Sequence, residues 1–269
     1  TQASSSAASD VYKRQVLAVS YAIWKTLINK VTLNISLGAG HSLGEYTALV
    51  ANRALSYKEG LLLVKKRAEL MSNAMEHIDG AMAAVIGIEG DSVDKVCKQE
   101  TKENNIIEAV NFNCPGQTVI AGHSSAVDAI IPALKNAGAK IVKKLPVSLA
   151  AHTSLLKPVA NELSNVLGKL SFNKNDFDIV HNYDLSVSQY GEHLNRVLSN
   201  QVCSPVRWIE TLEMFKANNI SNIIEVGPGS VLSGLVKRFD KSINVYPTKS
   251  IEDINCLLYT SPSPRDSFR

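Results

Sequence analysis

One serine of the sequence lies in a pattern that could make it a nucleophile. Gly40-His41-Ser42-Leu43-Gly44 fits G-x-S-x-G, in which a serine occupies a strained turn between a strand and a helix. The β-like run LNISLGA precedes the motif and the helical run LGEYTALVA follows it, and both glycines are expected to be required for their small size. The Leu43 N–H, at the helix start, could stabilise an oxyanion. The alternative is a turn without chemistry, but this context favours a nucleophile.

A nucleophilic serine needs a general base at neutral pH. The histidines are His41, His77, His123, His152, His181 and His193. His41 lies inside the elbow and should not reach its own serine, while His77 and His193 lie in polar segments that predict exposure. His152 follows LPVSLAA, whose two alanines leave room for a ligand. His152 is therefore the candidate base, and a structural role is the alternative.

The segments around these residues alternate between strand and helix patterns. Leu17, Tyr21, Trp24 and Leu27 have helical spacing, and VTLNISLGAG reads as a buried strand. Ser56 is placed to cap a second helix. Beyond residue 150, a helix, the strand DIVHNYD, a helix from SPVRW and the strand–glycine–helix run NIIEVGPGSVLSGLVKRF follow. This order predicts an α/β fold with a mainly parallel sheet.

Residues 79–148 follow a different pattern. AMAAVIGI, IIEAVNFN, QTVIAGH and KIVKKLPVS read as strands, and DSVDKVCKQET and SSAVDAIIPALKNAG as helices. The order βαββαβ predicts a ferredoxin-like subdomain inserted into the larger fold. Pro132 predicts a kink or a later start in its second helix.

The two terminal segments of the chain show no periodicity and do not continue the sequence patterns of the segments beside them. DVYKRQ can be encoded by GATGTGTATAAGAGACAG, and the reverse complement, in another frame, encodes CLLYTS of the other end. Both strings match the transposon-end adapters of sequencing libraries. Residues 1–15 and 256–269 are therefore interpreted as adapter-derived and are set apart from fold reasoning.

Composition excludes several classes of protein. The 269 residues are 45% hydrophobic and 20% charged, as in a globular domain, and the net charge of +3 does not indicate a nucleic-acid partner. No apolar run approaches the ~18 residues of a membrane span. Without Cys256, three cysteines remain and none has CxxC spacing, which argues against disulfides or a zinc site and suggests the cytoplasm.

Several longer motifs carry a family resemblance. GHSLGEYTALVA, RAELM, AMAAVIG, VNFNCPGQTVIAGH, LPVSLAAHTSLLKPVA, SPVRW and EVGPGSVLSGLVKR occur in the order found in malonyl-CoA:acyl carrier protein transacylases. The sequence resembles that family over nearly everything between the suspected adapter segments. The resemblance implies an α/β-hydrolase-like core, formed by residues 16–78 and 149–255, with the ferredoxin-like insert at 79–148. The family's N-terminal strand, whose Gly-Gln-Gly motif supplies a second oxyanion N–H, has no counterpart before Ser42.

The resemblance also implies roles for individual residues. Ser42 would be the nucleophile and His152 its base, while the Gln201 backbone carbonyl would orient the histidine in place of a triad carboxylate. Arg67 would bind the malonyl carboxylate, for which a planar guanidinium is suited; its alternative is a solvated helix charge. Met71 would line the same pocket or pack in the core.

The activity implied is that of an acyl-carrier-protein S-malonyltransferase of fatty acid biosynthesis. A malonyl group would pass from malonyl-CoA to Ser42 and then to the phosphopantetheine thiol of acyl carrier protein. CoA and phosphopantetheine enter as substrates, and no metal, further cofactor, nucleic acid or membrane is expected. A monomer in the cytoplasm is expected. The alternatives are an acyltransferase domain of a polyketide synthase, a serine esterase or thioesterase on the same core, and a truncated chain without activity.

Overall fold

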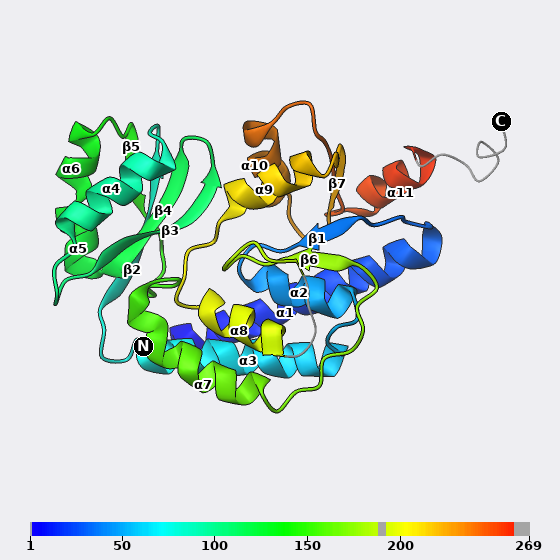
Figure 1. The fold of residues 1–269 in the computed structure, drawn as a ribbon, viewed down its shortest axis with the longest axis horizontal. Helices are drawn as coiled ribbons and strands as arrows, with labels where there is room; N and C mark the ends of the chain where they lie inside the picture. Colours follow the sequence, from blue (N-terminus) through cyan, green and yellow to red (C-terminus); the bar gives the residue numbers. More distant parts are fainter. Residues whose placement is uncertain (1, 188–191, 261–269) are drawn as a thin grey trace.

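The computed structural model describes residues 2–187 and 192–260. Most of the predicted adapter-derived C-terminal segment, residues 261–269, lies outside the described residues, as does residue 1. The described part is a mixed α/β structure with parallel and antiparallel sheets (Figure 1).

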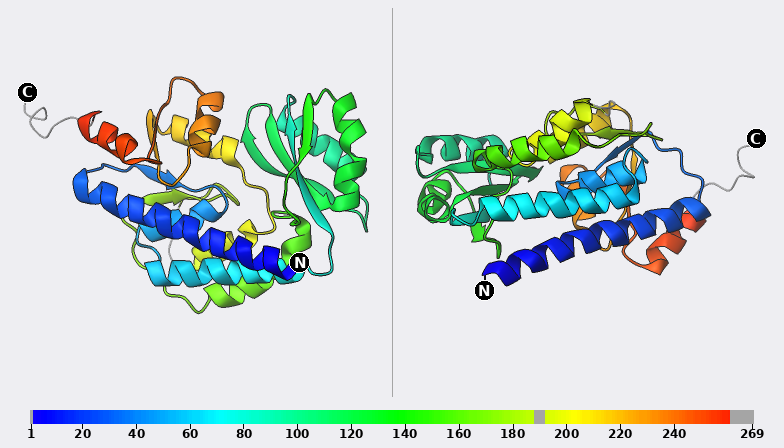
Figure 2. Two further views of the ribbon diagram at one scale, coloured as in Figure 1. Left: turned by 180° about the vertical axis from the view of Figure 1, so that it is seen from behind. Right: turned by 90° about the horizontal axis from the view of Figure 1, so that it is seen from below.

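The N-terminal part contains three helices and one short strand. They are α1 (Gln2–Lys30), β1 (Leu37–Ala39), α2 (Leu43–Ala51) and α3 (Tyr57–Ala74). The first helix continues backward from the predicted helical stretch into the suspected adapter-derived segment, where no periodicity predicted regular structure. Ser56 caps α3 as predicted, in a reciprocal capping box with Glu59. Both views of Figure 2 show α1 lying along α3.

A four-stranded antiparallel sheet and three helices follow. They are β2 (Gly80–Ile86), α4 (Gly90–Glu100), β3 (Ile107–Cys114), β4 (Gln117–His123), α5 (Ser124–Ala129), α6 (Ile131–Asn136) and β5 (Ile141–Lys144). The strand order is β3-β4-β2-β5, so the predicted succession of strands and helices is confirmed. The predicted break at Pro132 is also present, because α5 ends at Ala129 and α6 begins with Pro132 in its first turn.

The C-terminal part adds helices and two parallel strand pairs. Its elements are the 3₁₀ helix η1 (Ser154–Leu156), α7 (Lys157–Leu167), β6 (Asp178–Val180), α8 (Glu192–Gln201), α9 (Trp208–Ala217), β7 (Asn222–Glu225), α10 (Val231–Phe239), β8 (Asn244–Pro247) and α11 (Ile251–Thr260). β1 pairs with β6, and β7 pairs with β8, both in parallel. Helix α8, strand β8 and helix α11 were not predicted.

The parallel strands differ from the prediction in two respects. Among the described residues, the predicted sheet is divided into the separate pairs β1-β6 and β7-β8. The predicted strand in residues 31–40 is reduced to three residues, all partly exposed rather than buried. In keeping with the partial exposure of its residues, β1 has a described strand partner on only one side.

The inserted sheet separates two hydrophobic clusters. Residues such as Ala83, Val85 and Ile120 pack with α4, α5 and α6, whereas Met82 and Val119 belong to the cluster that includes α2, α3 and α7. This alternation follows the period of two in a strand. The sheet β3-β4-β2-β5 therefore packs one face on helices α4, α5 and α6 and presents a second apolar face to the rest of the molecule.

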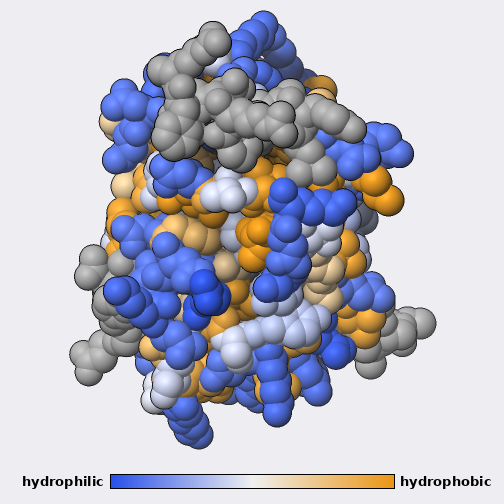
Figure 3. Space-filling model, turned by 90° about the vertical axis from the view of Figure 1, so that its right-hand side faces the viewer, coloured by the Kyte–Doolittle hydropathy of each residue, from blue (hydrophilic) through white to orange (hydrophobic). Residues whose placement is uncertain are grey.

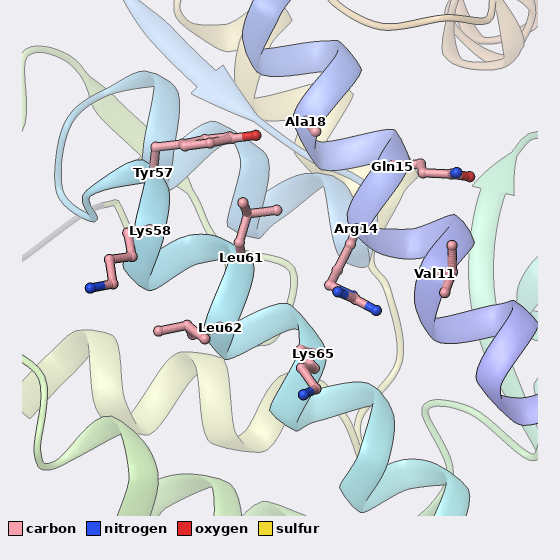
Figure 4. Close-up of a pocket in the computed structure, with 9 residues that line it drawn as sticks. All are labelled: Val11, Arg14, Gln15, Ala18, Tyr57, Lys58, Leu61, Leu62 and Lys65. Carbon is pink, nitrogen blue, oxygen red and sulfur yellow. The ribbon is translucent and has the colours of Figure 1, made fainter.

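A pocket with an apolar lining lies on the surface between α1 and α3. It has a volume of about 690 Å³ and is lined by residues that include Val11, Tyr57, Leu62 and Lys65 (Figure 4). The face that carries α11 shows hydrophobic and hydrophilic residues interspersed (Figure 3). Within residues 2–187 and 192–260, no helix is long and apolar enough to cross a membrane.

Candidate active site

Ser42 occupies the turn between β1 and α2. Its backbone has φ 52° and ψ −106°, a conformation that is costly for a residue with a Cβ. Such strain persists only where the surroundings fix the turn, and it projects the side chain away from both flanking elements. Leu43, the other predicted elbow residue, is the first residue of α2, so its N–H lies at the positive end of the helix.

The two glycines of the motif differ in their surroundings. A Cβ on Gly40 would lie 2.0 Å from the backbone carbon of Gly44, whereas a Cβ on Gly44 would meet nothing within 4 Å. The expectation that both positions require a small residue is therefore wrong for Gly44. Only Gly40 has no room for a Cβ atom, because there the end of the strand and the start of the helix are in direct contact.

His152 lies beside the serine, although 110 residues separate them in the chain. Ser42 Oγ is 2.7 Å from His152 Nε2, and His152 Nδ1 is 2.8 Å from the backbone oxygen of Gln201. Because a carbonyl oxygen only accepts hydrogen bonds, the proton belongs on Nδ1 and Nε2 is left to accept from the serine. His152 itself has φ 65°, and its backbone N–H donates to Val202 O at 3.0 Å.

The protonation state of His152 follows from its environment. Only 3% of the residue is exposed. Burial, reinforced by the positive charge of Arg67, lowers the pKa of His152 from 6.5 to about 3. The imidazole is therefore neutral at pH 7 and able to accept a proton.

Arg67 reaches the same site from α3. It is 3% exposed, and its Nη2 lies 3.3 Å from Ser42 Oγ and 3.1 Å from Gln201 Oε1. Its guanidinium stands over the ring of Tyr46, 5.4 Å from the centroid. The alternative interpretation as a solvated helix charge is wrong. Arg67 Nε is buried and has no hydrogen-bond partner among the described residues.

Of the six site residues predicted from the sequence, the structure brings four into mutual contact. Ser42, His152, Arg67 and Gln201 form one hydrogen-bonded group. Leu43 adjoins the group in the chain. Met71, one helical turn beyond Arg67, is 2% exposed and belongs to the main hydrophobic cluster.

Several polar residues to which the sequence assigned no catalytic role surround this group. His41 Nε2 lies 2.8 Å from Asn113 Oδ1 on β3, which connects the elbow to the insert, and burial lowers the pKa of His41. Glu45 and Asn182, both fully buried, contact the elbow region. Asn113 belongs to the NFN segment, which the sequence indicated could face the cleft but which was assigned no role. Glu45 is close to the motif in the sequence, whereas no local signal identifies Asn182.

Two other histidines were expected to be exposed. His77 is exposed as predicted. The prediction for His193 is wrong, because it is partly buried and its Nε2 lies 2.7 Å from Ser186 Oγ. The described parts of the chain contain no group of three or more His, Cys, Asp or Glu residues that could hold a metal ion.

Comparison with protein families gives one domain match. The model described as "Acyl transferase domain" matches residues 15–254. Among curated proteins, the malonyl CoA-acyl carrier protein transacylase of Escherichia coli K12 is 40% identical over 218 residues, which are 81% of this chain and 69% of that protein. The protein of the same name from Haemophilus influenzae is 37% identical over 243 residues, covering 90% and 78%.

Solved structures of malonyl transacylases are also similar to this chain. The malonyl CoA-acyl carrier protein transacylase of Coxiella burnetii has a TM-score of 0.89 at 33% identity, covering 93% of this chain and 79% of that one. A malonyl-transacylase in complex with its type II PKS acyl-carrier protein also has a TM-score of 0.89, at 38% identity, covering 92% and 80%.

Proposed function

Because this chain belongs to the acyl transferase domain family, we propose that it moves a malonyl group from malonyl-CoA to the phosphopantetheine thiol of an acyl carrier protein. It is then an acyl-carrier-protein S-malonyltransferase, and its place is in fatty acid biosynthesis. The observation that carries the proposal is the 2.7 Å contact between Ser42 Oγ and His152 Nε2, with a buried arginine beside it.

In the first half-reaction Ser42 Oγ attacks the thioester carbonyl carbon while His152 Nε2 takes the hydroxyl proton. The tetrahedral intermediate collapses, the carbon–sulfur bond breaks, and His152 returns the proton to the CoA sulfur. A malonyl ester on Ser42 remains. The Leu43 N–H, at the start of α2, is placed to stabilise the oxyanion.

In the second half-reaction the carrier protein's thiol takes the place of CoA. His152 removes the thiol proton, the sulfur attacks the ester carbonyl, and the carbon–oxygen bond to Ser42 breaks. The proton returns to Ser42 Oγ. CoA and phosphopantetheine enter only as substrates, so these steps use no resident cofactor.

Arg67 is the residue proposed to select the acyl group. Its Nη2 is 3.3 Å from the nucleophile, and its buried Nε has no partner among the described residues. A buried guanidinium N–H without an acceptor is costly, and a carboxylate accepts from two such N–H groups at once. The free carboxylate of a malonyl group supplies that acceptor, whereas an acetyl group does not. Met71, on the same helix, is proposed to line the acyl pocket.

The environment of His152 favours acyl transfer over an esterase with a carboxylate triad. Its Nδ1 is bonded to the backbone oxygen of Gln201 rather than to an acidic side chain. A polyketide pathway remains a second candidate for the carrier protein, because one similar structure contains a type II PKS acyl-carrier protein.

The domain organisation is also part of the proposal. Residues 16–78 and 149–255 form an α/β-hydrolase-like core, residues 79–148 a ferredoxin-like insert, and residues 1–15 and 256–269 are adapter-derived. A further N-terminal strand belongs to the core. The separation of β1-β6 from β7-β8 supports this, because β1 and β7 are both only partly buried and each has one described strand partner. We place the enzyme in the cytoplasm as a monomer.

Intact mass spectrometry after brief incubation with malonyl-CoA tests the reaction. We expect one malonyl adduct on the wild-type chain, none on Ser42→Ala, and none with acetyl-CoA in place of malonyl-CoA. If no adduct forms, the test is repeated with a family N-terminus grafted before Val16. An unmodified grafted chain would overturn the transacylase proposal.

A further inference from the structure

The backbone of Ser42 is bound on both sides by side chains from distant parts of the chain. The Ser42 N–H donates to Asn182 Oδ1 at 2.7 Å, and the Ser42 carbonyl oxygen accepts from Gln201 Nε2 at 2.9 Å. Asn182 Nδ2 also donates to the carbonyl oxygen of Gly40 at 2.8 Å. The two peptide groups that determine the strained turn are thus held by two amide side chains.

Both amide-bearing residues meet at one buried carboxylate. Glu45 Oε2 accepts from Gln201 Nε2 at 2.7 Å and from the Asn182 backbone N–H at 3.3 Å, while Glu45 Oε1 lies 2.7 Å from His181 Nδ1. Glu45, His181 and Asn182 are each 0% exposed. A buried carboxylate is costly unless it is hydrogen-bonded, so losing any of these partners is expected to disturb the whole arrangement.

We propose that Asn182 and Glu45 are positioning residues that clamp the elbow, so that Ser42 Oγ stays within reach of His152. This inference rests on the proposed function, because it gives these residues a role in the same reaction. Asn182 fixes the turn directly. Glu45 fixes Asn182 and Gln201, and through the Gln201 side chain it also fixes Arg67.

The strain at Ser42 explains why a clamp is needed. A non-glycine residue at φ 52° and ψ −106° costs about 1–3 kcal/mol relative to a relaxed backbone. Within the elbow itself, the backbone N–H groups of Gly44 and Glu45 donate to His41 O and Ser42 O. Neither engages the Ser42 N–H, whose acceptor is Asn182. Without that acceptor the turn is free to relax and to carry Ser42 Oγ away from the imidazole.

The test compares Asn182→Ala with Asn52→Ala, a matched control. Asn52 is also 0% exposed and also bonds two backbone groups, Phe177 O and Ala54 N, but it does not contact the elbow. The probe is a fluorophosphonate, whose phosphorus is attacked by the serine oxygen with loss of fluoride. It measures the reactivity of Ser42 without any thioester substrate. Steady-state kinetics with malonyl-CoA give kcat and KM separately.

We expect Asn182→Ala to be labelled about 100-fold more slowly than wild type, the typical cost of misplacing a reacting group by ~1 Å. Its KM for malonyl-CoA should be unchanged, because Gln201 still holds Arg67. Asn52→Ala should be labelled at the wild-type rate. Glu45→Gln should lower the labelling rate and raise KM as well, because it loosens both Asn182 and Gln201.

Equal labelling of Asn182→Ala and Asn52→Ala would overturn the clamp. If Asn182→Ala does not fold, Asn182→Leu replaces it, since leucine has nearly the shape of asparagine but offers neither the acceptor for the Ser42 N–H nor the donor to Gly40 O. We expect its labelling rate to be lowered, and a wild-type rate would overturn the proposal. A wild-type chain that is labelled at Ser42 but not acylated by malonyl-CoA would contradict the proposed function and leave the clamp intact.

Discussion

At the scale of single residues, one guanidinium has two consequences for the site. Arg67 offers a buried donor to a substrate carboxylate, and its charge also helps to keep His152 neutral. In the proposed mechanism, the first effect selects the acyl group, and the second keeps His152 free to accept a proton. The two effects can be separated experimentally, because only the first depends on the substrate.

Replacing Arg67 should change which acyl group is accepted. In Arg67→Ala, the malonyl carboxylate would lose a charge-assisted, bidentate partner, and we expect the acylation rate with malonyl-CoA to fall by about 100-fold or more. Arg67→Lys should recover only part of this loss, because an ammonium group cannot form the paired bonds. The preference for malonyl-CoA over acetyl-CoA, measured by competition and mass spectrometry, should shrink in both variants. An unchanged preference would exclude Arg67 from selection.

The pH dependence of Ser42 reactivity should report the environment of His152. Because its pKa is lowered from 6.5 to about 3, the neutral base persists as the pH falls below 6.5, and fluorophosphonate labelling should stay near its maximal rate to below pH 5. Labelling of Arg67→Gln, which removes the positive charge, should begin to decline at a higher pH. Circular dichroism at each pH identifies any loss due to unfolding. A wild-type decline centred at 6.5 would contradict the assignment.

The site was predictable from sequence as far as its residues lie in recognisable local motifs. Ser42 was identified by the elbow pattern, His152 was one candidate among six histidines, and the roles of Arg67 and Gln201 came from the family resemblance. Asn182 could not be found, because its importance arises from a hydrogen bond to a residue 140 positions away. A local pattern carries no information about such contacts.

At the scale of elements, the elbow joins β1 to α2. Its two glycines differ in whether a larger side chain can be accommodated. Gly40→Ala would force a Cβ to 2.0 Å from the backbone of Gly44. We expect it to lower the free energy of unfolding by about 1–3 kcal/mol, as overpacking does. Acylation should nearly cease because the turn must open. Gly44→Ala should leave the free energy of unfolding unchanged or raise it by up to ~1 kcal/mol, from the higher helix propensity of alanine.

Chemical denaturation of both glycine variants, followed by labelling of Ser42, measures these effects. Wild type and Gly44→Ala serve as references for Gly40→Ala under the same conditions. If the two substitutions destabilise the protein equally, the difference in packing at the two glycines does not determine the stability of the turn.

Most elements were predictable where a local signal was strong. Ser56 correctly predicted where α3 begins, and Pro132 correctly predicted an interruption of the helical segment, which the structure divides into α5 and α6. The strand in residues 31–40 was predicted too long and too buried, because its β-branched composition does not reveal how many neighbouring strands are present. Helix α8 was not predicted from the sequence. It is only ten residues long and its sequence is polar overall, so its amphipathic pattern is a weak signal.

At the scale of the whole molecule, the two separate parallel pairs predict the effect of adding the further N-terminal strand proposed above. A chain in which residues 1–15 are replaced by a strand-forming family N-terminus should have a higher Tm, because β1 and β7 would gain a hydrogen-bonded neighbour. It should also acylate about 100- to 1000-fold faster if the added segment supplies a second oxyanion N–H. Thermal denaturation and the mass-spectrometric assay measure the two effects. An extension of scrambled sequence is the control, and equal Tm values for both extensions would contradict the proposal.

The four-stranded sheet has a further consequence for protein engineering. The chain enters this subdomain through β2 and leaves it through β5, and these strands are paired neighbours, with Ala83 opposite Lys144. A subdomain whose two junctions lie side by side and whose helices pack on a core of its own can be exchanged as a cassette. Chimeras should therefore tolerate a foreign sheet that keeps an apolar side chain at Met82 and Val119 and an amide at Asn113. Such hybrids would show which part of the molecule determines the choice of carrier protein.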